Sequence, residues 1–239
     1  MSERVCLIAG VGPGTGAECA RRFARGGYRV AMIARDQERL DALEAEIEGS
    51  KGYFCDVSDL EGLVATAERI TSEMGPPEVV IHNAVMGILD GGGAATFMES
   101  DPERLERNFR VNTTSLLYLA RATAPAMIEA GKGAIIVTGN TAAKRGSPKF
   151  AYFAPTKAAQ RILAESMARE LGPKGIHVAY VLVDAAIDTP RTRPVFWPDE
   201  DDAFFCKPSA IADEVYHVVH QDRSAWSFLV ELRPDNETW

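Results

Sequence analysis

The segment at residues 4–20, RVCLIAGVGPGTGAECA, constrains the fold of this chain more than any other. Residues 5–9 form a short apolar run, which is typical of a buried parallel strand. A helical pattern of apolar residues begins at Ala17, and four glycines separate it from the strand: Gly10, Gly12, Gly14 and Gly16. The order strand, glycine turn, helix is the context in which such a motif binds a dinucleotide.

The chemistry of this turn suits a pyrophosphate. Glycine adopts positive φ and lets a ligand approach the backbone closely. The free N–H groups and the positive dipole end of the following helix would then face the phosphates. The spacing Gly12-x-Gly14-x-x-Ala17 matches the dinucleotide fingerprint with alanine at its third position. The alternative is a turn whose glycines serve tight packing alone.

The rest of the chain repeats the strand–helix alternation. Apolar runs predict further strands at residues 28–34, 53–55, 78–82, 134–138, 176–183 and 228–232. Amphipathic patterns predict helices at residues 37–48, near 60–74, from 102 towards 130, at 152–171 and from 208. Residues 184–206 form a long irregular stretch with three prolines. This order predicts an α/β fold with a doubly wound parallel sheet and helices on both faces.

Composition limits the domain count and the class of protein. The chain has 239 residues, 46% of them apolar and 25% charged, which allows one large α/β domain or two small ones. No internal repeat, low-complexity tract or linker divides it. We therefore expect a single domain over residues 1–239.

Charge and residue usage also limit the partners. The formal charge of −8 is spread over interspersed acidic and basic residues, so no nucleic-acid partner is expected. The chain shows no membrane-spanning apolar stretch and no signal peptide pattern. The histidines have no metal-ligand spacing, so no metal is expected. The cysteines stand singly, as in a cytoplasmic protein with reduced thiols: Cys6, Cys19, Cys55 and Cys206.

Over essentially its whole length the chain resembles the short-chain dehydrogenase/reductase family. The matching pieces are Gly10-x-x-x-Gly14-x-Gly16, Cys55-Asp56-Val57, Asn83-Ala84, Val111-Asn112, the strand at 133–137 and Thr156-Lys157-Ala158-Ala159. The resemblance implies a Rossmann-like sheet of seven strands, a nicotinamide cofactor and a small-molecule substrate. It also implies subunits that pair through two long central helices, hence a homodimer or homotetramer.

The same resemblance assigns cofactor contacts. It places Asp56 and Val57 beside the adenine, Asn83 and Ala84 near the nicotinamide ribose, and Thr189 at the carboxamide. The remaining contacts that it implies come from the glycine turn and one lysine: Gly10, Gly12, Gly14, Thr15, Gly16 and Lys157.

The end of the second strand bears on the choice between NADP and NAD. Ala34 takes the position of the usual ribose-binding acid, and Arg35 follows it. An arginine there favours the 2′-phosphate of NADP. Asp36 and the absence of a basic residue at Pro13 count against NADP, and Arg35 could be a solvated cation. On balance the sequence favours NADP over NAD.

The chain departs from the family at the catalytic residues. In the family, a tyrosine four residues before a lysine donates a proton, a serine thirteen residues earlier binds the substrate oxygen, and an asparagine holds a relay water. Lys157 and Asn112 are present, but Phe153 stands at the tyrosine position and Asn140 at the serine position. The chain thus looks like a divergent member that lacks the usual acid.

Several substitutes for the missing acid stay open. Tyr152 could serve if the helix starts after it. On the helix, a step of one residue would rotate its side chain by about 100°, and it could instead be an ordinary buried or interface tyrosine. The Asn140 amide could bind a carbonyl oxygen. Lys157 could donate a proton if burial lowers its pKa, or it could only hold ribose hydroxyls.

The substrate pocket should be walled by residues 85–96, 140–150 and 194–205, with a substrate loop at about 185–207. Aromatic residues in these walls favour an apolar or aromatic substrate, unless they only pack a lid or an interface: Phe150, Phe153, Phe196, Trp197, Phe204 and Phe205.

The sequence therefore predicts an NADP(H)-dependent oxidoreductase for a small carbonyl or alcohol with an atypical proton route. The alternative is an NADP(H)-binding protein without redox turnover, such as a sensor or a partner subunit. A weaker alternative is elimination chemistry with Lys157 as the base.

Overall fold

The computed structural model describes residues 4–87 and 96–236. In these residues the strands are β1 (Arg4–Ala9), β2 (Tyr28–Ala34), β3 (Ser50–Phe54), β4 (Val79–His82), β5 (Gly133–Asn140), β6 (Ile176–Val183), β7 (Ala186–Ile187), β8 (Phe205–Cys206) and β9 (Leu229–Leu232). The helices are α1 (Thr15–Arg25), α2 (Gln37–Glu46), α3 (Leu60–Met74), α4 (Pro102–Phe109), α5 (Ser115–Ala130), α6 (Ala154–Leu171), α7 (Arg193–Phe196) and α8 (Pro208–Val219).

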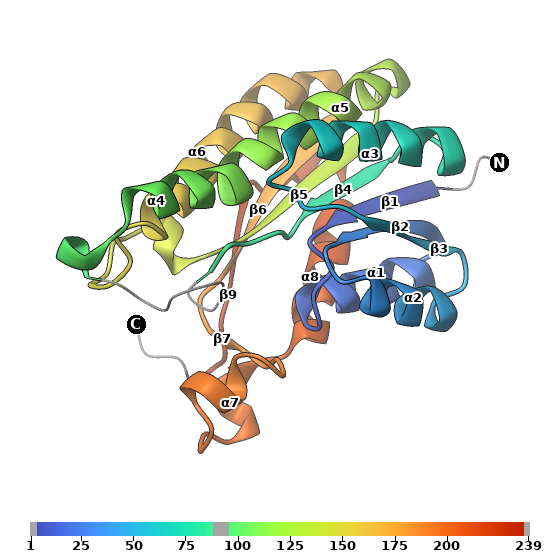
Figure 1. Ribbon diagram of the computed structural model, residues 1–239. Helices are drawn as coiled ribbons and strands as arrows, with labels where there is room; N and C mark the ends of the chain where they lie inside the picture. The colour runs from blue at the N-terminus through green and yellow to red at the C-terminus, as the bar shows by residue number, and fades with distance from the viewer. Residues whose placement is uncertain (1–3, 88–95, 237–239) are drawn as a thin grey trace.

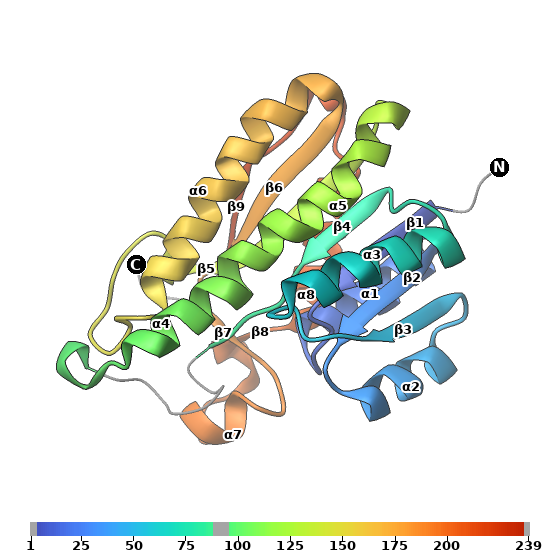
Figure 2. The same cartoon turned by 45° about the horizontal axis from the view of Figure 1, so that its top comes forward.

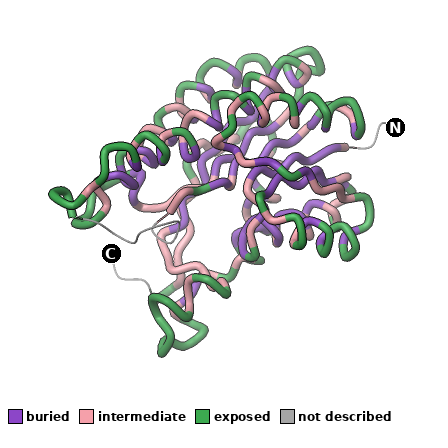
Figure 3. The backbone as a smooth tube through the Cα atoms, in the orientation of Figure 1, coloured by how far each residue is buried: buried purple, intermediate pink, exposed green. Residues whose placement is uncertain are grey.

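Seven strands form one parallel sheet in the order β3-β2-β1-β4-β5-β6-β9. Helices α3, α5 and α6 cover one face, and α1, α2 and α8 cover the other (Figures 1 and 2). Successive residues of β1 alternate between the two cores, with Leu7 packing under α3 and α5 and Ile8 under α1 and α8. The inner strands β1, β2, β4 and β6 are therefore buried on both sides, whereas the edge strands β3 and β9 are partly exposed (Figure 3). The predicted Rossmann-like fold is confirmed.

The strand order fixes where a ligand can bind. The chain builds outward from β1 to β2 and β3, and then returns to add β4 on the other side of β1. The loops after β1 and β4 leave the sheet in opposite directions at its carboxyl edge, which opens a crevice between them. Ala9 pairs with Ile33 of β2 and His82 of β4, so the glycine turn starts directly at this crevice.

The segment between β6 and α8 is more ordered than the predicted irregular stretch. It contains the parallel pair β7–β8 and the short helix α7, and it projects beyond the carboxyl edge of the sheet (Figures 1 and 2). We call residues 186–206 the flap. Its aromatic rings pack against one another, with centroid distances of 5.4 Å for Phe196–Trp197, 5.7 Å for Trp197–Phe204 and 5.1 Å for Phe204–Phe205.

Two predicted helices need correction. The helix expected from residue 102 to 130 is interrupted by a π-helical turn at Arg110–Thr114, which contains Asn112. The helix expected from Tyr152 begins at Ala154, with Phe153 as its N-terminal cap residue. Pro155 explains this start, because proline has no N–H and is accommodated in the first turn of a helix. Tyr152 therefore lies in the turn before α6, not on the helix.

No helix in the described part of the chain is both long and apolar enough to cross a membrane.

Candidate active site

The glycines of the first turn serve different purposes. Gly10 has φ +95°, and a Cβ added there would lie 2.4 Å from the Ala84 backbone nitrogen. A Cβ at Gly16 would lie 2.5 Å from the Gly10 carbonyl oxygen. A Cβ at Gly12 would meet no heavy atom of the described residues within 4 Å. Gly10 and Gly16 are therefore required for packing, whereas Gly12 leaves open space of the kind a phosphate group can enter.

The start of α1 has the donors that an anion needs. Gly14 is the N-terminal cap residue and offers no side chain to the first N–H groups of the helix. The Ala17 N–H donates to the Gly12 carbonyl at 3.2 Å, so the N–H groups before it and the positive end of the helix dipole are the groups available to a phosphate. Thr15 is buried beside them. Thr189, from the flap, packs on Gly14, because a Cβ there would lie 2.6 Å from Thr189 Cγ2.

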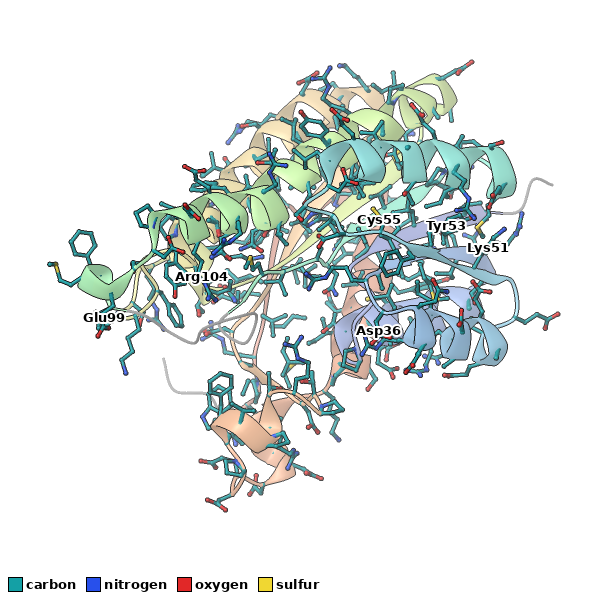
Figure 4. The ribbon with its side chains drawn as sticks, viewed as in Figure 1. Asp36, Lys51, Tyr53, Cys55, Glu99 and Arg104 are labelled. Atoms are coloured by element: carbon teal, nitrogen blue, oxygen red, sulfur yellow. The ribbon has the colours of Figure 1, made fainter. Side chains whose placement is uncertain are left out.

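A groove of about 660 Å³ runs along the carboxyl edge of the sheet, between the ends of β1, β2, β3 and β4. Asp36 at the start of α2 and Cys55 just after β3 border it (Figure 4). The predicted cofactor residues that line it are Gly10, Gly12, Arg35, Asp56, Val57, Asn83 and Ala84. Arg39 and Arg191 also line it, and the sequence analysis did not identify either one.

The end of this groove beside β2 and β3 carries two arginine–aspartate pairs. The Asp36 carboxylate accepts a hydrogen bond from the Arg39 backbone N–H at 3.0 Å and lies 2.8 Å from the Arg39 guanidinium. Arg35 Nη1 lies 3.5 Å from Asp56 Oδ2. Burial alone would raise the pKa of Asp56, but the Ser58 hydrogen bonds and the Arg35 charge lower it overall. Both carboxylates are thus balanced by a cation.

Asn83 connects the glycine turn to the lysine of the site. Its Nδ2 donates to the Gly10 carbonyl at 2.7 Å, and its Oδ1 accepts from the Thr138 hydroxyl at 2.9 Å. The Thr138 carbonyl in turn accepts from Lys157 Nζ at 3.1 Å. The neighbouring strands β4 and β5 hold these groups together at their carboxyl ends.

Lys157 is 2% exposed and lies among neutral groups. Its second hydrogen bond goes to Gln160 Oε1 at 2.5 Å. Burial lowers the pKa of Lys157 to about 7. An amine with this pKa is partly protonated at neutral pH and can both hold and release a proton.

Asn112 lies in the π-helical turn, fully buried. Its Oδ1 accepts from the Met86 N–H at 2.8 Å. Its Nδ2 donates to Thr156 Oγ1 at 2.9 Å and to the Met86 carbonyl at 3.3 Å. The side chain therefore joins the loop after β4 to α6, next to Lys157, and each of its polar atoms has a protein partner.

The residues at the expected acid and serine positions carry no proton donor of the usual kind. Phe153 is buried against Ala142 and Ala154, with its ring 5.8 Å from that of Phe150 in an edge-to-face arrangement. Asn140 Oδ1 accepts from the Ala142 N–H at 3.2 Å, so its amide NH₂ is the group that remains for a ligand.

Tyr152 is buried as well, and its ring lies 4.8 Å from the guanidinium carbon of Arg104. Arg104 belongs to α4 (Figure 4). The tyrosine thus packs toward α4.

The predicted pocket walls are described only in part, since residues 88–95 lie outside the described residues. Sequence reasoning also missed Thr138, Gln160, His82 and Tyr180 around Lys157. The spacing of three between Lys157 and Gln160 could have indicated that pair, because such residues lie on one helix face. The other contacts cross from helix to strand and have no local signal.

Comparisons with known proteins agree with this architecture. The family model described as short chain dehydrogenase matches residues 4–197. L-xylulose reductase of Mesocricetus auratus is 29% identical over 179 residues, which are 74% of this chain and 70% of that protein. The solved short-chain dehydrogenase from Rhodopseudomonas palustris shows 30% identity and a TM-score of 0.81, covering 97% of this chain and 98% of that one. A metagenomic short-chain oxidoreductase in complex with NADP shows 28% identity and a TM-score of 0.82, covering 98% of both chains.

Proposed function

This chain belongs to the short-chain dehydrogenase family, and we propose that it is an NADP(H)-dependent oxidoreductase for a small carbonyl or alcohol, as its relative L-xylulose reductase supports. The observation that carries the proposal is the buried Lys157 amine, which is joined through Thr138 and Asn83 to the glycine turn. Its pKa of about 7 lets it hold the proton that Phe153 cannot supply.

The groove suits the proposed cofactor. Open space at Gly12 and the uncapped start of α1 would receive the pyrophosphate. Asp56 and Val57 would border the adenine, and Asn83 and Ala84 the nicotinamide ribose. Bound NADPH would supply the hydride for reduction of a carbonyl.

The charges at the adenine end support NADP over NAD. Asp36 was the main argument against a 2′-phosphate, but its carboxylate is compensated by Arg39. Arg35 and Arg39 both line the groove and can form charge-assisted hydrogen bonds to phosphate oxygens. The solved relative in complex with NADP supports the same choice.

The proton route proposed here uses groups of this chain alone. The Asn140 amide NH₂ would bind the substrate oxygen, while Lys157 would give the proton directly or through a water molecule. Tyr152 is a weaker candidate for the acid, because its ring packs beside Arg104. Thr189, held at Gly14, would meet the carboxamide side of the cofactor.

The substrate and the assembly follow from the same proposal. The substrate loop at about 185–207 includes the flap, whose packed aromatic rings favour an apolar or aromatic substrate. The chain would act as a single dinucleotide-binding domain over residues 1–239, in a homodimer or homotetramer.

A second candidate function is cofactor binding without redox turnover. The observation that favours it is Phe153, which sits in an apolar cluster with Ala142, Ala154 and Phe150 where a phenol would be needed. Such a protein would be a sensor or a partner subunit.

Two measurements test these functions. First, the melting temperature is recorded with NADPH, with NADH and without ligand. A ligand at 100 times its Kd stabilises the folded state by about 2.7 kcal/mol. At equal concentrations the nucleotide with the lower Kd raises the melting temperature more, so NADPH should give a larger shift than NADH. If neither NADPH nor NADH shifts the melting temperature, both candidate functions are refuted. A larger shift with NADH than with NADPH would refute the assignment of NADP.

Second, the wild type and Phe153→Tyr, alone and with Asn140→Ser, are assayed against a broad panel of carbonyls and alcohols. Turnover by the wild type supports the oxidoreductase. Turnover that appears only in the variants supports the binding protein.

A further inference from the structure

A chain of buried polar side chains crosses the apolar core between the sheet and helices α5 and α6. It runs from Lys157 through Gln160 and His82 to Ser115, and none of these residues is more than 2% exposed. Polar groups at this depth are costly unless each donor meets an acceptor. The role of this series of side chains therefore depends on the donor and the acceptor in each of its hydrogen bonds.

The direction of the hydrogen bonds follows from the Ser115 hydroxyl, which selects the tautomer of His82. The Ser115 hydroxyl donates to the Val111 carbonyl at 2.6 Å, so its oxygen accepts from His82 Nε2 at 2.7 Å. His82 then carries its proton on Nε2, and its Nδ1 accepts from Gln160 Nε2 at 3.3 Å. Burial, together with the charge of Lys157, lowers the pKa of His82 to about 3, which keeps the ring neutral. The Gln160 carbonyl is consequently turned toward Lys157.

Tyr180 holds the same amide from the side of β6. Its hydroxyl donates to Gln160 Oε1 at 3.4 Å, so this oxygen accepts from both Tyr180 and Lys157. The phenol fits because residue 139 is glycine, since a Cβ at Gly139 would lie 2.0 Å from the Tyr180 oxygen. Tyr180 and His82 thus fix both ends of the amide.

The far end of the chain is closed. The Val111 carbonyl that terminates it belongs to the π-helical turn, one residue before Asn112. At this end the series of hydrogen bonds therefore stops at a backbone carbonyl and is unsuited to carry protons outward. What it does connect is the amine of Lys157 with the turn that carries Asn112.

We propose that Gln160 is a positioning residue, locked by His82 and Tyr180, that holds the Lys157 amine beside the Thr138 carbonyl of β5 and controls how readily this amine keeps its proton. The catalytic consequence of this role rests on the proposed oxidoreductase function.

The groups around the amine support this role. The titratable side chains that approach it are His82 from β4 and Tyr180 from β6, and burial raises the pKa of the phenol, so both are neutral at pH 7. The Thr138 carbonyl of β5 accepts a hydrogen bond from the Lys157 amine. In the described residues, α5 contributes the Ser115 hydroxyl to this series of hydrogen bonds. A neutral amide stabilises an ammonium far less than a carboxylate does at the same distance. Burial lowers the proton affinity of Lys157, and the identity of residue 160 therefore sets how much of that affinity is recovered.

The test compares Gln160→Glu and Gln160→Leu with the wild type. The protonation midpoint of Lys157 is measured by NMR on protein with ¹³C-labelled lysine Cε, and Lys157→Met assigns the signal. A carboxylate at residue 160 should raise the midpoint by more than one pH unit, which is more than a tenfold gain in proton affinity. Leucine removes an acceptor of the ammonium and should lower the midpoint. Gln37→Glu, on the exposed side of α2, should leave it unchanged.

Equal midpoints in the wild type and the Gln160 variants would overturn the proposal. If Gln160→Glu fails to fold, Gln160→Leu and the isosteric Gln160→Met decide the question, since both should lower the midpoint. NADPH titration of the same samples separates the two proposals. A shifted midpoint in a protein that does not bind NADPH contradicts the proposed function alone, whereas NADPH binding with unshifted midpoints contradicts the role of Gln160 alone.

Discussion

Replacing Lys157 by methionine should change how the stability of the protein depends on pH. In the folded state the pKa of this amine is about 7, against 10.5 for a solvated lysine, because the side chain is buried. Between pH 7 and pH 10.5 the Lys157 amine is therefore mostly protonated in the unfolded protein and mostly neutral in the folded protein. The linkage relation then requires wild-type stability to rise with pH over this range.

The magnitude follows from the two pKa values. Each unit of separation corresponds to about 1.4 kcal/mol, so burial of the amine costs the wild type roughly 4 kcal/mol at pH 7 and roughly 2 kcal/mol at pH 9. Methionine has a similar length and no proton to lose. It also leaves the Thr138 carbonyl and Gln160 Oε1 without this donor, but that cost does not depend on pH. The free energy of unfolding of the variant, relative to the wild type, should therefore fall by about 2 kcal/mol from pH 7 to pH 9.

Urea denaturation of both proteins at pH 6, 7, 8 and 9, followed by tryptophan fluorescence, measures this difference. Lys174→Met is the matched control, because Lys174 is a surface residue paired with Glu170, and its difference from the wild type should be constant over the same range. A Lys157→Met difference that varies by less than about 0.5 kcal/mol between pH 7 and pH 9 would refute the assignment of a neutral-range pKa to the buried amine.

Three further substitutions have expected outcomes. Arg39→Ala should weaken NADPH binding about tenfold or more in a fluorescence titration and leave NADH binding unchanged, because a charge-assisted hydrogen bond contributes about 1.5–3 kcal/mol; Arg69→Ala, exposed on α3, should change neither. Phe153→Tyr should increase carbonyl reduction measured by NADPH absorbance, whereas Tyr152→Phe should leave it unchanged. Asn112→Ala should lower the free energy of unfolding in urea by about 2–4 kcal/mol, because the Met86 N–H loses its acceptor and the buried Thr156 hydroxyl, which still donates to the Phe153 carbonyl, loses the hydrogen bond that it accepts.

Each of these three predictions would be contradicted by a specific result. Equal losses of NADPH and NADH affinity in Arg39→Ala would place this residue outside the 2′-phosphate contact. A loss of turnover in Tyr152→Phe would make Tyr152 the acid in place of Lys157. Unchanged stability in Asn112→Ala would mean that water replaces the lost hydrogen bonds.

The parallel sheet was predictable because its signals are local. Apolar runs alternating with amphipathic helices identify buried strands, and a glycine turn between the first strand and helix marks the crevice. The residue types at positions 112, 140, 153 and 157 were also visible in the sequence, including the absence of a phenol at residue 153. Helix limits were less accurate, since the π-helical turn around Asn112 leaves the apolar periodicity almost unchanged.

The sequence by itself therefore determined the fold, the family and the types of residue at the site, because each depends on patterns within one element or on motif spacing. Only the tertiary structure decided the environment of those residues. The pairing of Arg35 with Asp56, the open space at Gly12 and the contacts of His82 and Tyr180 with Gln160 depend on contacts between different elements. Strand register and side-chain reach set such contacts, and the pKa of Lys157 depends on how deeply they bury its amine.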